Sequence, residues 1–174
     1  MPELEAVFAV RDFVERGGDV LLVIALVTAV MWMLIYERFW YFRFQHKREV
    51  ENAKKLWDDW DDHTSWEGRQ YRRMLISEVR LKLERGLPLI GTIVVVCPMF
   101  GLLGTVTGMI EVFDVMAVAG SGNARGMAAG VSKATLPTMA GMVGALSGML
   151  FHIQLRRFAM SEAERVADTL LVKD

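Results

Sequence analysis

A few polar side chains lie inside two long apolar, glycine-rich segments between residues 90 and 154, which a short polar stretch at 120–123 joins. These side chains are Thr105, Glu111, Asp114, Lys133, Thr138 and His152. If the apolar segments cross a membrane, hydrocarbon rejects each of these groups unless the group has a partner or a function. We therefore take them as the residues that carry the chemistry of the chain.

The positions of these groups predict two polar layers at different depths. Two antiparallel helices that close near residue 121 bring to equal depth those residues whose numbers add to about 243. Thr105 and Thr138 then form one layer near the middle of the membrane, and Glu111 and Lys133 form a second layer about two turns closer to the outside. We expect Glu111 and Lys133 to pair, with Asp114 as a second acceptor, either within one subunit or between neighbours. The alternative is that Lys133 extends outward beside Arg125 without a functional role.

Small residues predict how the two segments pack. Gly101, Gly104, Thr105 and Gly108 share one face of the first segment, and the second segment has two small faces. One of these faces comprises Ala134, Thr138, Gly141, Ala145, Gly148 and His152, and the other comprises Pro137, Ala140, Gly144 and Ser147. Small faces let helix backbones approach closely in lipid, so two of them on one helix favour an oligomer. Glycine is also common in membrane helices, which is the alternative explanation. Pro137 removes a backbone donor, and we expect a kink beside Thr138 where water gathers.

The elements that position these residues are predicted to be helices throughout. Hydrophobic residues make up 53% of the chain and charged residues 24%, which fits an all-α polytopic membrane protein with three membrane-spanning helices. We expect an amphipathic surface helix at 1–18, a first span at 19–40, a water-exposed helical region at 41–87, a hairpin of the second and third spans at 88–156 with its loop near 119–125, and a tail helix at 157–174. A buried core helix is the alternative for the first span. Ser65 or Thr64 is expected to cap a helix on which Tyr71, Leu75 and Val79 form a stripe.

Charge fixes the expected orientation. The basic residues near the spans gather on one side, which should be cytoplasmic: Arg38, Arg43, Lys47, Arg48, Arg80, Lys82, Arg85, Arg156 and Arg157. The chain is expected to start outside, cross three times and end inside, with the long second and third spans projecting into the cytoplasm. His152, near that end of its span, is expected to reach headgroups or water.

Several functions have no support in the sequence. The net charge of −1 gives no electrostatic basis for nucleic-acid binding. The lone Cys97 is expected to be a small buried hydrophobe, and the acidic cluster before His63 lacks the oxygen spacing of a calcium loop, so we expect no metal and no cofactor. The sequence contains no nucleophile–base pair, no HExxH motif and no phosphate loop, so an enzyme is not expected.

Two motifs in the hairpin resemble a known family. Residues 97–108 read CPMFGLLGTVTG and residues 130–142 read GVSKATLPTMAGM, which is similar to the second-span and third-span signatures of the ExbB/TolQ/MotA proton-channel family. The resemblance implies a homopentamer in the bacterial inner membrane, with a periplasmic N-terminus and a cytoplasmic C-terminus. It also implies a pore lined by the second and third spans, in which a dimer of a single-span ExbD-like protein carries protons on an aspartate facing Thr105 and Thr138. Such a complex uses proton-motive force to drive TonB, which powers uptake across the outer membrane.

One position departs from the family pattern. Lys133 stands where the family often has glutamate, which suggests a second ExbB type with its own ExbD and TonB and argues against a proton-relay role there. A TolQ-type envelope motor and a MotA-type flagellar stator are alternatives, and the small cytoplasmic region disfavours the flagellar one. A passive membrane scaffold is the alternative from a different class, and the threonine layer argues against it.

Overall fold

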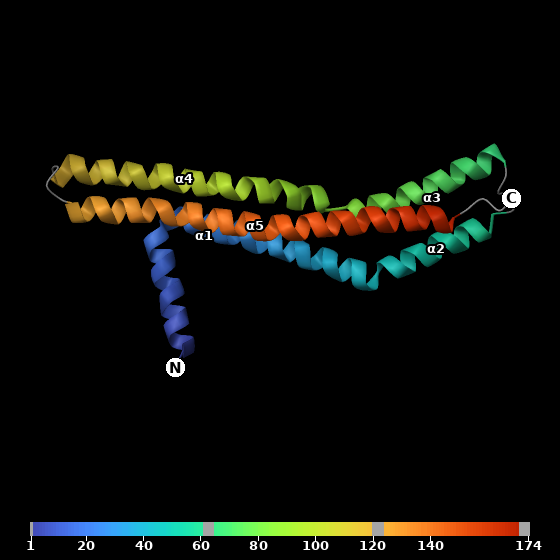
Figure 1. Ribbon diagram of the computed structural model, residues 1–174, viewed down its shortest axis with the longest axis horizontal. Coiled ribbons are helices and arrows are strands. Elements are labelled where there is room, and N and C mark those ends of the chain that lie inside the picture. Colours follow the sequence, from blue (N-terminus) through green and yellow to red (C-terminus); the bar gives the residue numbers. More distant parts are fainter. Residues whose placement is uncertain (1, 61–64, 120–123, 171–174) are drawn as a thin grey trace. The chain divides into compact units, whose positions relative to one another are not determined.

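The described part of the chain forms five α-helices (Figure 1). The computed structural model describes residues 2–60, 65–119 and 124–170, with side chains from residue 18 onward except at 47, 119, 124 and 125. The helices are α1 (Pro2–Phe44), α2 (His46–Asp58), α3 (Trp66–Glu84), α4 (Leu87–Ala119) and α5 (Ala124–Thr169). No strand occurs in these residues, so the predicted all-α fold is confirmed. The predicted loop at 120–123 lies outside the described residues.

Among the described residues, three helical stretches are long and apolar enough to cross a membrane. They are Gly18–Phe44, Trp66–Val118 and Gly126–Thr169, so the three spans expected from the sequence are present. Many large apolar side chains on these stretches point outward, among them Leu26 (66% exposed), Met33 (75% exposed) and Val118 (91% exposed). Such exposure would be unfavourable in water and is expected for helices that face lipid or other membrane helices.

Contacts divide the chain into two compact units. The hairpin unit comprises residues 1–32 and 92–149, and the base unit comprises residues 33–91 and 150–174. Helices α1, α4 and α5 each contribute to both units. The candidate residues Thr105, Glu111, Asp114, Lys133 and Thr138 all belong to the hairpin unit.

In the hairpin unit, α4 and α5 lie side by side (Figure 1). The two helices pack through glycines. A Cβ atom added at Gly108 would lie 2.6 Å from the Cα of Ala134, and one at Gly101 would lie 3.0 Å from the Cα of Thr138. Gly104 faces the ring of Pro137, which is itself fully buried. The contacts run in opposite directions along the two helices, so the helices are antiparallel, and no side chain separates their backbones at these points.

The second small face of α5 contacts α1 of the same chain. At Gly144 on this face, a Cβ would lie 2.9 Å from the hydroxyl oxygen of Thr28 on α1. Gly148 of the first small face also meets α1, at Met31. The contact at Gly144 is thus made within the chain, and the expected oligomer remains a prediction. Pro137 lies within α5, which continues as one helix from Ala124 to Thr169.

The backbone of α1 is interrupted at Gly18. This residue has φ 67° and ψ −171°, a combination that is essentially restricted to glycine, so the stretch before it and the span after it are separate helical segments. A Cβ at Gly18 would also lie 2.9 Å from the Cε atom of Lys133. Gly18 thus combines a bend in α1 with a close contact to α5.

In the base unit, α3 begins as the sequence predicts. The hydroxyl of Ser65 accepts a hydrogen bond of 3.0 Å from the backbone N–H of Gly68, and Ser65 is the N-cap. Leu75 and Val79 are buried, so the predicted stripe faces the core of the unit. Thr64 and the acidic cluster at 61–63 lie outside the described residues.

Polar contacts tie the base unit together. His46 lies 3.1 Å from Glu162 of α5, and Lys82 of α3 lies 2.7 Å from Glu49 of α2. Arg72 donates to the carbonyl oxygens of Ala167, at 2.7 Å, and Leu170, at the end of α5, where the helix itself offers carbonyls no further N–H partners. These contacts connect α2 and α3 to the last turns of α5.

Candidate functional site

The first part of the site is the hydroxyl of Thr138. It donates a hydrogen bond of 3.2 Å to the carbonyl oxygen of Gly101, which crosses from α5 to α4. The approach is possible because Gly101 has no side chain: a Cβ at this position would lie 3.0 Å from the Cα of Thr138. The side chain of Thr138 is half-buried at this contact.

The second part is the hydroxyl of Thr105. It donates a hydrogen bond of 2.7 Å to the carbonyl oxygen of Leu102 in its own helix. Gly101 and Leu102 are consecutive residues, so the two threonine hydroxyls lie at nearly the same level of α4. In both cases the hydroxyl proton is used by a carbonyl, and the lone pairs of the oxygen remain as acceptors.

The charged layer is an ion pair within one chain. Lys133 Nζ lies 2.7 Å and 2.8 Å from the two carboxylate oxygens of Glu111. The side chain of Lys133 is 34% exposed and that of Glu111 is 50% exposed. Asp114, which the sequence suggests as a second acceptor, is exposed and is not an ion-pair partner of Lys133 in the described structure. It lies almost one turn further along α4, and its side chain is shorter than that of glutamate.

The charged layer borders a polar hollow of about 190 Å³ in the hairpin unit. Its lining residues come from α1, α4 and α5: Gly18, Asp19, Val20, Gly104, Thr107, Gly108, Glu111 and Lys133. Thr107 lies about 200° around α4 from Thr105, so the hollow and the threonine layer are on different flanks of the helix. The hairpin therefore presents its charged layer towards the hollow beside α1 and the hydroxyl of Thr105 on a different flank of α4. The depth of each residue along the helix does not reveal that the two layers lie on different flanks of α4. The six-residue spacing from Thr105 to Glu111 does indicate it.

The remaining predicted residues have packing roles. Ala145 is buried, and a Cβ at Gly141 would lie 2.7 Å from the carbonyl oxygen of Cys97, which is fully buried. In the base unit, the ring of His152 packs against Gly91, with a ring nitrogen 3.2 Å from where a Cβ of Gly91 would lie. The expectation that His152 reaches headgroups or water is therefore wrong, because its ring turns towards α4.

These observations define a class of protein: a multi-pass membrane protein with a close-packed helical hairpin that carries a hydroxyl layer and a separate ion pair. Residues 52–168, well over half of the chain, match the MotA/TolQ/ExbB proton channel family. The chain belongs to this family, and its membership supports a role in a proton channel.

Two proteins of the cyanobacterium Synechocystis sp. are similar to part of the chain. Their names describe them as biopolymer transport proteins ExbB-like 3 and ExbB-like 1. The first is 35% identical over 89 residues, which is 47% of this chain and 42% of the relative. The second is 39% identical over 72 residues, which is 40% of this chain and 28% of the relative. The chain thus covers less than half the length of either protein.

Proposed function

We propose that the chain is a subunit of an inner-membrane proton channel that works with an ExbD-like single-span protein and energises a TonB-like protein. The threonine layer is the observation that carries this proposal. Both hydroxyl protons are donated to carbonyls of α4, at 3.2 Å for Thr138 and 2.7 Å for Thr105. The two oxygens therefore accept hydrogen bonds from water or from a protonated group, without titrating themselves.

The proton carrier comes from a partner in this proposal. Between residues 87 and 149 the acidic residues are Glu111 and Asp114, and neither is at the level of the threonines. Glu111 is held by Lys133, whose Nζ lies 2.7 Å from its carboxylate, so it already has a partner within the chain. An aspartate on a helix placed against the flank that carries Thr105 and Thr138 would complete the path, and this is the group that ExbD-like proteins supply.

The assembly and orientation follow from the same proposal. Thr105 lies on a different flank of α4 from the hollow that α1 lines, so several copies arranged around a partner helix, five in this family, would be able to direct their hydroxyls inward. The basic residues near Arg43 and Arg156 support a cytoplasmic location for that end of the spans and a periplasmic N-terminus. The names of the two Synechocystis relatives favour the ExbB role over the TolQ or MotA role.

The proposal is tested by replacing both threonines with valine. The double variant Thr105→Val/Thr138→Val keeps the side-chain shape and removes both acceptors, so we expect loss of energised uptake with assembly unchanged. Ser147→Ala is the matched control. The hydroxyl of Ser147 donates a hydrogen bond of 2.7 Å to the carbonyl oxygen of Gly144 in its own helix. Ser147 lies about half a turn around α5 from Thr138. The measurements are uptake of an iron chelate and co-purification of the ExbD-like partner.

Two outcomes would contradict the proposal. Normal uptake in the double variant would show that the hydroxyls do not serve the proton path. Loss of uptake together with loss of the partner would show that the threonines act in assembly instead. The Ser147→Ala control must retain uptake for the comparison to hold.

A further inference from the structure

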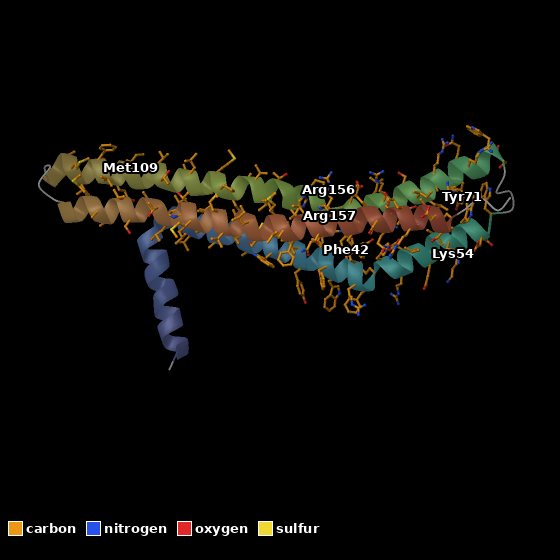
Figure 2. All side chains as sticks on the ribbon, in the orientation of Figure 1. Phe42, Lys54, Tyr71, Met109, Arg156 and Arg157 are labelled. Carbon is orange, nitrogen blue, oxygen red and sulfur yellow. The ribbon has the colours of Figure 1, made fainter. Side chains whose placement is uncertain are left out.

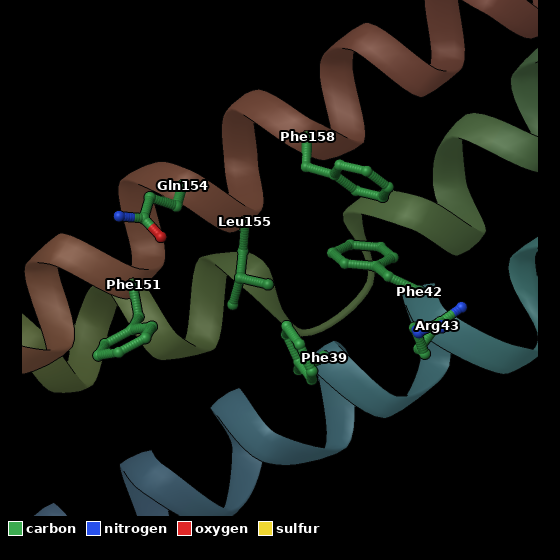
Figure 3. Close-up of a pocket in the computed structure, with 7 residues that line it drawn as sticks. All are labelled: Phe39, Phe42, Arg43, Phe151, Gln154, Leu155 and Phe158. Carbon is green, nitrogen blue, oxygen red and sulfur yellow. The ribbon is translucent and has the colours of Figure 1, made fainter.

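A groove in the base unit has apolar walls and a cationic rim. It encloses about 340 Å³ between the end of α1 and the middle of α5, and Figure 3 shows its lining. Phe39, Phe42 and Arg43 come from α1, and Phe151, Gln154, Leu155 and Phe158 come from α5. Four phenylalanines and a leucine form the walls, so the groove suits a hydrocarbon chain.

The groove lies where the apolar parts of both helices end. The rings of Phe42 and Phe158 are 5.0 Å apart, which places these two turns at the same level. On α1, Tyr36, Trp40 and Phe44 are all more than half exposed at this level. Exposed aromatic side chains at the end of an apolar helix are typical of the boundary between membrane and water. The groove therefore opens at this boundary, where lipid headgroups lie.

The rim of the groove is positive at Arg43, which is exposed and belongs to its lining (Figure 3). The helix segments that carry the groove, residues 37–44 and 150–158, contain four arginines and one glutamate, a net charge of +3. Arg38 pairs with that glutamate, Glu37, at 3.2 Å, and Arg156 and Arg157 are exposed on α5 beside the lining residue Leu155 (Figure 2). Anionic headgroups are attracted to such basic clusters beside a membrane helix.

We propose that this groove binds an anionic phospholipid, with one acyl chain between the phenylalanines and the phosphate at Arg43. The ligand chemistry follows from the two halves of the site. The walls match an apolar chain, and the rim matches a negative group at the level where a phosphate lies. A second copy of this chain would fill the apolar walls equally well, and its presence there is an outcome of the test.

The test uses the full chain in its purified complex, reconstituted into vesicles of equal parts phosphatidylglycerol and phosphatidylethanolamine. Native mass spectrometry then counts the lipids that stay bound after extraction. We expect the wild-type complex to retain phosphatidylglycerol preferentially. Arg43→Gln should reduce that preference about fivefold, as expected for the loss of one cation near a membrane surface. Phe158→Leu should reduce the number of retained lipids of both kinds.

The control is Arg73→Gln, which removes an exposed arginine of α3 outside the groove and should leave lipid retention unchanged. Equal retention of the two lipids by the wild type would overturn the proposal, and so would a loss in Arg73→Gln as large as that in Arg43→Gln. A Phe158→Leu complex that loses subunits but keeps its lipids would show that another copy of the chain occupies the groove instead.

Discussion

The hydroxyl of Thr138 donates a hydrogen bond of 3.2 Å to the carbonyl of Gly101, and this bond joins α5 to α4. The bond forms because Gly101 lets the two backbones approach, with 3.0 Å between a Cβ at Gly101 and the Cα of Thr138. Close packing and a fixed hydroxyl therefore depend on the same residue pair. Substitutions at the threonines can nevertheless separate an effect on stability from an effect on proton transfer.

Valine at the two threonines should have different effects on stability. Thr138→Val removes a hydrogen bond between helices and should lower the free energy of unfolding by about 0.6 kcal/mol, the average for such bonds in membranes. Thr105→Val removes a bond within α4, to Leu102 at 2.7 Å, and should leave stability nearly unchanged. Both single variants should reduce energised uptake. Unfolding in detergent and uptake in cells are the two measurements.

Thr138→Ser is the matched control for Thr138→Val, since it keeps the hydroxyl and removes only a methyl group. Serine should retain uptake. If Thr105→Val destabilises the protein as much as Thr138→Val, the assignment of the bond between helices to Thr138 alone is wrong.

Alanine substitutions at the glycines should follow the available space. Gly108→Ala places a Cβ 2.6 Å from the Cα of Ala134, a backbone atom that cannot move independently, and should cost about 1–3 kcal/mol. Gly101→Ala, with its nearest atom at 3.0 Å, should cost less. Gly91→Ala meets the ring of His152 at 3.2 Å, and the better helix propensity of alanine should offset most of that contact.

Thermal unfolding of the purified protein measures this order. The close-packing interpretation fails if Gly108→Ala is no less stable than Gly91→Ala. Gly→Ala changes share the same gain in helix propensity, so the differences between the three variants report packing.

The sequence predicted what depends on depth and on local spacing. Antiparallel helices fix which residues share a level, so Glu111 and Lys133 could be paired before the structure showed their 2.7 Å contact. The cap of α3 at Ser65 depends only on residues within one turn, so its hydrogen bond of 3.0 Å was equally predictable from the sequence. Both predictions rest on geometry that every α-helix shares.

The sequence could not show how the helices are rotated against α1. Helix α4 is apolar on all sides, so its pattern does not distinguish a face that meets lipid from one that meets protein. For this reason the small face at Gly144 indicated another subunit, although Thr28 of α1 contacts this face. The same rotation decides that Lys133 borders the hollow beside α1 and that Thr105 lies on a different flank of α4.

Reversing the charges of the ion pair should be damaging singly and tolerated together. Lys133→Glu or Glu111→Lys replaces an attraction by a repulsion between groups that are 34% and 50% exposed, and should cost about 1 kcal/mol. The double swap should recover at least half of that loss. Native mass spectrometry of the assembled complex and thermal unfolding are the measurements.

The comparison for this swap is the pair of Arg80 and Glu84 on α3, 2.8 Å apart and exposed. Arg80→Glu should leave stability nearly unchanged, because Arg80 lies on the surface of a solvated helix. If the double swap at Glu111 and Lys133 recovers nothing, pairing is not what holds these residues in place.

Gly18 and Lys133 should be energetically coupled. Gly18→Ala forces a non-glycine residue to adopt φ 67° and should cost about 1–3 kcal/mol in backbone strain. The new methyl group would also lie 2.9 Å from the Cε atom of Lys133, which adds a steric term. In a Lys133→Ala background the steric term disappears and the strain remains, so Gly18→Ala should cost about 0.5 kcal/mol less there than in the wild type. Unfolding of the four proteins of this cycle measures the coupling. Equal costs in both backgrounds would show that the stem of Lys133 does not pack on the bend of α1, whereas a cost near zero in both would show that the bend itself is not strained.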